Sequence, residues 1–299
     1  MQTYGFLEIG AVVLALFLPG CRLPNREGPV PKQLATCRRL SQLGVAAIER
    51  GKWDEAEKLL ARAIETCPAD PEARRHYAEA LWRRGARREA VSQLEEAARL
   101  ADGDAALHVR IADMRLAMGQ MEPARRQAEQ ALDLDPKLSA AWGIRGRVMQ
   151  TAGNTQQALA DCHRALAYAP NDRATLLEIA ELYRELDRPQ RALAVLHNLA
   201  DSYAPGEEPQ QVLYLTGLAY MALERYDDAA ESFSTAVVRG TPKPEIFYRL
   251  ATAEFFAGRP TKAATAAQRA LALDPQHPAS HELLNRLELV GQVEAPSRR

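Results

Sequence analysis

The 299-residue sequence has little excess charge of either sign and few aromatic side chains. Its 38 lysines and arginines are offset by 39 aspartates and glutamates, which leaves a formal net charge of −1 at pH 7. Because no block of basic residues stands out, the sequence offers no electrostatic support for binding nucleic acid. Aromatic residues make up only 6% of the chain, a composition that suits helices packed through small side chains.

The common motifs of catalysis and metal binding are also lacking. The sequence contains no glycine-rich phosphate loop, no Gly-x-Ser-x-Gly turn and no Cys-x-x-Cys pair. Of the six histidines, His277 and His281 come nearest to metal-ligand spacing, but Pro278 lies between them and indicates a helix start. We therefore expect that the protein is not an enzyme and needs no metal or other cofactor.

Long hydrophobic runs are limited to one short stretch near the start. Residues 9–18 are uncharged and apolar, too few for a membrane span of about 20 residues but suitable for the apolar part of a secretory signal. The stretch ends in Leu18-Pro19-Gly20-Cys21, which resembles a bacterial lipoprotein signal. That resemblance implies that Cys21 is lipidated and becomes the new N-terminus.

The start of the chain leaves other interpretations open. Pro19 is unusual in a lipoprotein signal, and residues 1–10 contain Glu8 but no lysine or arginine. An uncleaved membrane anchor within residues 4–18 and an apolar tail of a cytosolic protein are the alternatives. The lipoprotein interpretation predicts a location in the bacterial cell envelope, anchored to a membrane and facing the periplasm.

What the sequence does have is a ladder of alanines at a constant spacing. Five of them lie 34 residues apart, and two more continue at the same step after a single gap of 37: Ala56, Ala90, Ala124, Ala158, Ala192, Ala229 and Ala263. A fixed period of this length indicates stacked copies of one supersecondary unit rather than a single globular core.

Other positions recur with the alanines. A glycine lies five residues before five of them, a small residue twelve before all of them, and a proline twelve after four of them. Glycine permits the left-handed conformation that ends a helix, and proline cannot continue one. Small residues allow two helices to cross closely. Each unit is therefore predicted to be a helix, a tight turn, a second helix and a stop.

This pattern resembles the tetratricopeptide repeat, whose unit is a 34-residue antiparallel helix pair. The resemblance implies an all-α, right-handed α-solenoid of seven units across residues 37–277: 37–70, 71–104, 105–138, 139–172, 173–209, 210–243 and 244–277. The fifth unit departs from the pattern, because it has three extra residues near Pro205–Pro209.

Shorter segments flank the predicted units. Residues 1–21 form the signal-like segment, and residues 22–36, rich in proline, are expected to be a flexible tether. Residues 278–292 carry an apolar stripe at helical spacing and are predicted to cap the last unit. Residues 293–299 are expected to be a disordered tail.

In the resembling family, the first helix of each unit lines a concave groove that holds partner peptides. Helical phase predicts the residues on that face in this chain. In units two to five they are mostly charged: Arg75, Glu79, Trp82, Arg110, Asp113, Arg147, Gln150, Glu178, Glu181 and Arg184. In the last two units they are mostly aromatic or apolar: Tyr214, Leu218, Met221, Tyr248, Thr252 and Phe255. Phase alone leaves open whether Tyr248 and Phe255 face the groove or pack on the capping helix.

Two cysteines fall at helix ends that an antiparallel pair places side by side. Cys37 opens the first helix of unit one and Cys67 ends the second. In an exported protein a disulfide between them would staple the first unit, although the sequence also permits two unpaired thiols.

The leading functional hypothesis is an interaction scaffold. It would be tethered to a bacterial membrane through Cys21, bind a protein or peptide in the groove, and help to assemble an envelope complex. The alternatives are a soluble adaptor that regulates an enzyme, and a solenoid that binds glycans or peptides.

Overall fold

The structure is a computed structural model that describes residues 32–294, with side chains to residue 289. This part of the chain contains fifteen helices and no strand. The first helices of the seven pairs are α1 (Lys32–Glu49), α3 (Pro71–Arg83), α5 (Ala105–Ala117), α7 (Ser139–Thr151), α9 (Arg173–Glu185), α11 (Gln210–Ala222) and α13 (Pro244–Phe256).

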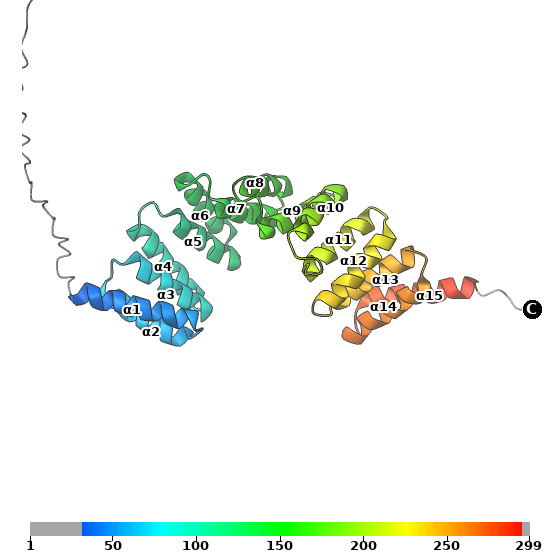
Figure 1. Ribbon diagram of the computed structural model, residues 1–299, viewed down its shortest axis with the longest axis horizontal. Coiled ribbons are helices and arrows are strands. Elements are labelled where there is room, and N and C mark those ends of the chain that lie inside the picture. Colours follow the sequence, from blue (N-terminus) through cyan, green and yellow to red (C-terminus); the bar gives the residue numbers. More distant parts are fainter. Residues whose placement is uncertain (1–31, 295–299) are drawn as a thin grey trace, which may run out of the picture.

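The second helix of each pair follows after a short turn. These helices are α2 (Trp53–Thr66), α4 (Arg87–Leu100), α6 (Met121–Leu134), α8 (Thr155–Tyr168), α10 (Pro189–Asp201), α12 (Tyr226–Arg239) and α14 (Pro260–Leu273). A single helix, α15 (Pro278–Glu294), follows the last pair. The pairs succeed one another in chain order along an arch, from α1 and α2 at one end to α15 at the other (Figure 1). The fold is therefore the all-α solenoid that the 34-residue period predicts.

The turn between the two helices of a pair needs a left-handed residue. Glycine supplies it in five pairs, with φ between 71° and 89°. Where glycine is missing, Asp187 (φ 54°) and Glu224 (φ 58°) adopt the same backbone region. The turn geometry is thus imposed by the packing of the helix pair, at the cost that side chains with a Cβ incur in this region.

Aspartate begins several first helices. Asp70 Oδ1 accepts hydrogen bonds from the backbone N–H groups of Glu72 (3.0 Å) and Ala73 (3.2 Å). Asp172 Oδ2 accepts one from Thr175 N (2.9 Å). Asp104 caps α5 in the same way, and these caps satisfy backbone donors that would otherwise lack partners at the starts of the second, third and fifth units.

The core runs through the whole stack rather than through one centre. All seven alanines of the ladder are at most 1% exposed. At each of these positions a larger side chain would push two helices apart. The largest fully buried side chain is Phe233 of α12, which lies against Gly217 of α11. Small residues on one helix therefore accommodate large residues on its partner.

The ends of the solenoid differ from the sequence-based boundaries. α1 begins at Lys32, so residues 32–36, assigned to the flexible tether, are helical. α15 extends to Glu294, two residues beyond the expected capping helix. The signal-like segment with Cys21, residues 22–31 of the tether and residues 295–299 of the tail lie outside the described residues. No helix within residues 32–294 is both long enough and apolar enough to cross a membrane.

The extra residues of the fifth unit form a loop between α10 and α11 that is held from both sides. The Arg173 guanidinium lies 4.1 Å from the centre of the Tyr203 ring, and its Nε donates to Ser202 Oγ (3.0 Å). On the other side, Gln210 Nε2 donates to the carbonyl of Ala236 (2.8 Å). The first contact lies within the fifth unit and the second within the sixth, so each end of the loop is held by the unit to which it belongs.

Candidate peptide-binding groove

The first helices form a continuous face, which we call the groove, and it carries three hollows. The N-terminal hollow, of about 330 Å³, lies over α3 and α5. The central hollow, of about 720 Å³, lies over α5, α7 and α9. The C-terminal hollow, of about 660 Å³, lies over α9, α11 and α13. No residue of a second helix lines the central or the C-terminal hollow, so first helices and the loops that precede them form this part of the groove.

Charged residues predicted for the groove form one chain of ion pairs across α3, α5, α7 and α9. Arg110 contacts Glu79 (2.6 Å) and Asp113 (2.8 Å). Arg147 contacts Asp113 (3.3 Å) and Glu178 (3.5 Å). Both arginines thus lie between two carboxylates, and each link from one unit to the next joins residues 31 to 34 positions apart in the chain. The repeat therefore aligns these charges in space.

The carboxyl of Glu178 has the most perturbed environment of this chain of ion pairs. Burial raises the pKa of Glu178 above its ordinary value, an effect that the neighbouring Arg147 opposes. The Cys162 thiol lies 3.8 Å from Glu178 Oε2. Burial and nearby carboxylates raise the pKa of that thiol to about 12. Cys162 is therefore a protonated, unreactive core residue at neutral pH.

The C-terminal hollow combines an apolar floor with polar residues at its edges. Leu215, Leu218 and Met221 of α11 form the floor, beside Tyr214 and Arg184. The predicted groove residues Arg184, Tyr214 and Met221 therefore lie together in one hollow. Tyr214 also packs against Phe233, with ring centres 5.9 Å apart.

Arg75 lines the N-terminal hollow together with Glu79 and Arg110. Arg110 also lines the central hollow, with Asp113 and Arg147. These residues are where helical phase predicts them.

Trp82, Tyr248 and Phe255 line none of these hollows. Trp82 packs on the core of its own unit near the turn, 5.5 Å from the Arg87 guanidinium. Its large ring extends from the groove edge toward the turn between α3 and α4.

Tyr248 and Phe255 are half-buried against α15. The ring of Tyr248 lies 5.5 Å from that of His277, and the guanidinium of Arg286 lies 5.2 Å from the ring of Phe255. Both side chains pack on the cluster that contains Leu283 and Leu287. Both side chains remain partly exposed, and these contacts are those of the alternative in which they pack near the capping helix.

Arg249 is a residue of the C-terminal hollow that the sequence analysis missed. It pairs with Glu245 (2.6 Å) and lines the hollow together with Tyr214. A signal for it existed, because Arg249 holds the same place in its unit as Arg110 and Glu178 hold in theirs. The apolar floor of the central hollow, with Val109 and Ile144, was also missed.

Cys37 and Cys67 are free thiols that lie close together. Cys37 Sγ is 3.5 Å from the carbonyl oxygen of Ala63, which also accepts the backbone N–H of Cys67 (2.8 Å). Burial and the neighbouring Cys67 and Asp70 raise the pKa of Cys37 to about 12. The disulfide remains a prediction, and the helix pair places its two partners side by side.

Within residues 32–289, no cluster of three or more histidine, cysteine or carboxylate side chains could hold a metal ion. The paired helices and the hollowed first-helix face define a helical-repeat solenoid, a class that typically serves as a non-catalytic scaffold for protein interactions.

Comparison with protein families identifies the repeat. Sequence profiles of the tetratricopeptide repeat match residues 38–80, 105–138, 177–245, 214–278 and 248–289. Together these segments span more than half of the chain, so the protein belongs to the tetratricopeptide repeat family. A search of curated proteins finds no match.

Solved structures show the same architecture. A tetratricopeptide repeat protein from Parabacteroides merdae matches with a TM-score of 0.61 and 15% identity, covering 85% of this chain and 99% of its own. The C-terminal part of a repeat protein from Cytophaga hutchinsonii matches with a TM-score of 0.62 and 16% identity, covering 82% and 99%. YrrB, a tetratricopeptide repeat protein, matches with a TM-score of 0.56 and 17% identity, covering 63% and 96%. At these identities the likeness shows the fold.

Proposed function

We propose that this protein is a membrane-tethered interaction scaffold that binds an extended segment of a partner protein in its groove. The partner belongs to a complex assembled in the bacterial cell envelope. The groove supplies the binding surface, and the N-terminal segment around Cys21 supplies the tether.

The C-terminal hollow is the observation that carries the binding proposal. Leu218 and Met221 of its floor are partly exposed, beside the buried Leu215. An apolar floor with a few polar groups at its edge is typical of a surface that captures a partner side chain. YrrB, which shares the fold, is described as having an unusual peptide-binding site.

The arrangement of the hollows favours an extended ligand. The central and C-terminal hollows meet at α9, where Glu178 faces one and Glu181 the other. A segment lying along the groove would occupy both hollows in succession. Because the surface exists before binding, the conformational entropy lost on binding is mainly that of the partner segment.

The tether rests on the sequence Leu18-Pro19-Gly20-Cys21. Anchoring would raise the effective concentration of the groove near other membrane proteins. Cys21→Ser tests this part of the proposal by cell fractionation and metabolic labelling with a fatty acid. Loss of label and release from the membrane are expected. Retention in the membrane without label would favour an uncleaved anchor, and a soluble wild-type protein would favour the soluble adaptor.

Affinity capture from detergent-solubilised membranes tests the groove. The baits are the chain itself, Met221→Glu in the floor of the C-terminal hollow, and Leu289→Glu on α15 as a control. Leu289 is 62% exposed and lies outside the groove. A partner retained by the control and lost by Met221→Glu supports the proposal, provided that circular dichroism shows the same melting curve for both variants.

Two results would contradict the groove proposal. Equal capture by both variants would move the binding surface away from the C-terminal hollow. Failure of the unaltered chain to capture any protein would argue against a scaffold of this kind.

A further inference from the structure

The central and C-terminal hollows differ in how their charges are balanced. In the central hollow, the carboxylates of Asp113 and Glu178 and the adjacent Glu79 already surround Arg110 and Arg147. An acidic ligand there would have to displace one of these pairs and would meet an excess of carboxylates. The central hollow is therefore unsuited to a ligand carboxylate.

Arg184 in the C-terminal hollow has a different environment. It forms no ion pair within 4.0 Å and no side-chain hydrogen bond in the described part of the chain, residues 32–289. The carboxylate that lines this hollow, Glu181, accepts a hydrogen bond from Gln211 Nε2 (2.9 Å). A cation at the edge of an apolar floor is thus available to a ligand.

A second guanidinium approaches the same place from the opposite helix. Arg249 of α13, Tyr214 of α11 and Arg184 of α9 all line the C-terminal hollow. Burial and Glu245 raise the pKa of the Tyr214 hydroxyl, and the two arginines oppose that rise. Arg249 is paired with Glu245 (2.6 Å). The hollow therefore holds two cations from two different helices beside a tyrosine hydroxyl, an arrangement that can receive a carboxylate with three donors.

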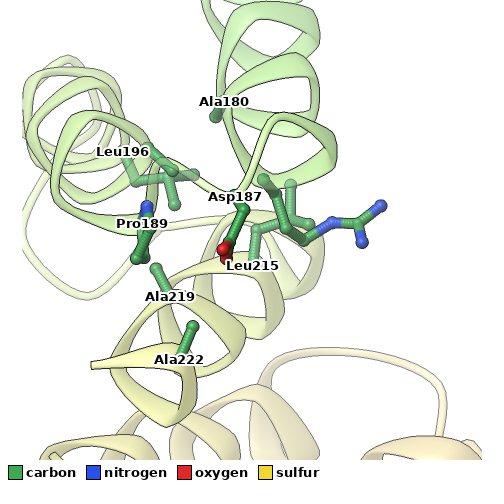
Figure 2. A pocket seen from close by; sticks show the side chains of 9 residues that line it. Ala180, Asp187, Pro189, Leu196, Leu215, Ala219 and Ala222 are labelled. Atoms are coloured by element: carbon green, nitrogen blue, oxygen red, sulfur yellow. The ribbon is translucent and has the colours of Figure 1, made fainter. Parts of the chain in front are cut away.

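A mostly apolar slot opens beside Arg184. It lies between α9, α10 and α11 and has a volume of about 20 Å³. Figure 2 shows Ala180, Leu196, Pro189, Leu215 and Ala219 around it, with the Asp187 carboxyl between Pro189 and Leu215. Such a space admits a group of about the size of one methyl. Arg184, Leu215 and Ala222 line both the slot and the C-terminal hollow.

We infer that the C-terminal hollow binds an acidic–apolar segment of the partner protein. The side-chain carboxylate of an aspartate or glutamate pairs with Arg184 and Arg249, and a neighbouring aliphatic side chain lies on Leu218 and Met221 with a methyl in the slot. The inference rests on the proposed function and specifies the chemistry of the ligand. The carboxylate belongs to a side chain, because the groove continues from this hollow into the central one and the bound segment has no need to end here.

A peptide selection tests the inference on the purified full-length chain. The library consists of random peptides displayed as an internal loop of a carrier protein, so that no free terminal carboxylate is present. Selected peptides are then synthesised with blocked ends and measured by fluorescence anisotropy. The variants are Arg184→Glu and a matched control, Arg269→Glu. Arg269 is an exposed arginine of the second helix α14 and lies outside the groove.

The expected result is enrichment of peptides that place aspartate or glutamate next to leucine, isoleucine, valine or methionine. Charge reversal at Arg184 should weaken their binding by about tenfold to a hundredfold, the range of a charge-assisted hydrogen bond, while the control should be unchanged. When the same library is selected for binding to the Arg184→Glu variant, basic–apolar peptides should be enriched instead.

The outcomes separate this inference from the proposed function. Enriched peptides without acidic residues, or peptides that bind the Arg184→Glu variant as tightly as the unaltered chain, would overturn the inference but not the scaffold proposal. Absence of any enriched peptide would overturn both.

Discussion

Two glycines on first helices give the most direct test of how the helices pack. A Cβ added at Gly217 would lie 2.6 Å from Phe233 Cε1 and 2.7 Å from its Cδ1. Phe233 is 0% exposed, so its ring cannot turn into solvent to relieve the contact. A Cβ added at Gly143 of α7 would meet no atom within 4 Å. The two glycines therefore differ in surroundings while sharing a helix-interior position.

The two substitutions to alanine should consequently have different signs. Replacing glycine by alanine inside a helix stabilises by about 0.8–1.0 kcal/mol. At Gly143 nothing opposes this gain, and we expect about 1 kcal/mol of added stability. At Gly217 the clash costs about 1–3 kcal/mol, so Gly217→Ala should be neutral to destabilising by about 2 kcal/mol.

The assay is thermal and urea unfolding followed by circular dichroism. For a chain of this size, 1 kcal/mol corresponds to about 2–4 °C in the melting temperature. A Phe233→Leu background removes the ring atoms that clash, and there Gly217→Ala should become stabilising relative to Phe233→Leu alone. If Gly217→Ala raises the melting temperature of the unaltered chain as much as Gly143→Ala does, the close approach of α11 and α12 does not exist as described.

Three further predictions address single interactions. Asp161 is 2% exposed and accepts two hydrogen bonds from Arg145 (2.7 and 2.8 Å). Asp161→Ala should therefore lower the free energy of unfolding, measured in urea, by about 3–5 kcal/mol, because it leaves Arg145 without its partner. The double variant Asp161→Leu with Arg145→Met should lower it much less. Oxidised glutathione should join Cys37 to Cys67, which lowers the intact mass by two hydrogen atoms and raises the melting temperature. Cys67→Ser should abolish both changes, and an unchanged mass of the unaltered chain would refute the pairing. Because burial raises the pKa of Glu178 above 4.5, the stability that Glu178 contributes is complete below pH 4.5 and is lost as the pH rises through the raised value. Glu178→Gln should therefore raise the melting temperature at neutral pH but not below pH 4.5, and an equal effect at both would contradict this assignment.

The repeat architecture could be predicted from the sequence because its packing is local. Each helix contacts the helices next to it in the chain, so the same small residue recurs wherever two helices cross. The alanine ladder records that contact directly. Helical phase then placed Arg75, Arg110 and Arg147 on the groove, since the face of a regular helix follows from spacing alone.

The surroundings of those positions could not be predicted in the same way. Phase assigns Tyr248 and Tyr214 the same place in successive units, yet Tyr248 packs beside His277 on the cluster that α15 joins, while Tyr214 lines a hollow. Arg147 and Arg184 also lie on the same face, but one is held between two carboxylates and the other has none. Such differences depend on which side chains reach across from neighbouring units.

The sequence by itself thus determined the unit, its number of copies and the face that each residue occupies, because these follow from periodicity and from the sizes of the packing residues. Only the tertiary structure decided which groove positions are open, which charges neutralise one another, and where an unpaired arginine meets an apolar floor. Those properties arise from contacts between units, and a repeat constrains the spacing of the contacts without constraining the side chains that make them.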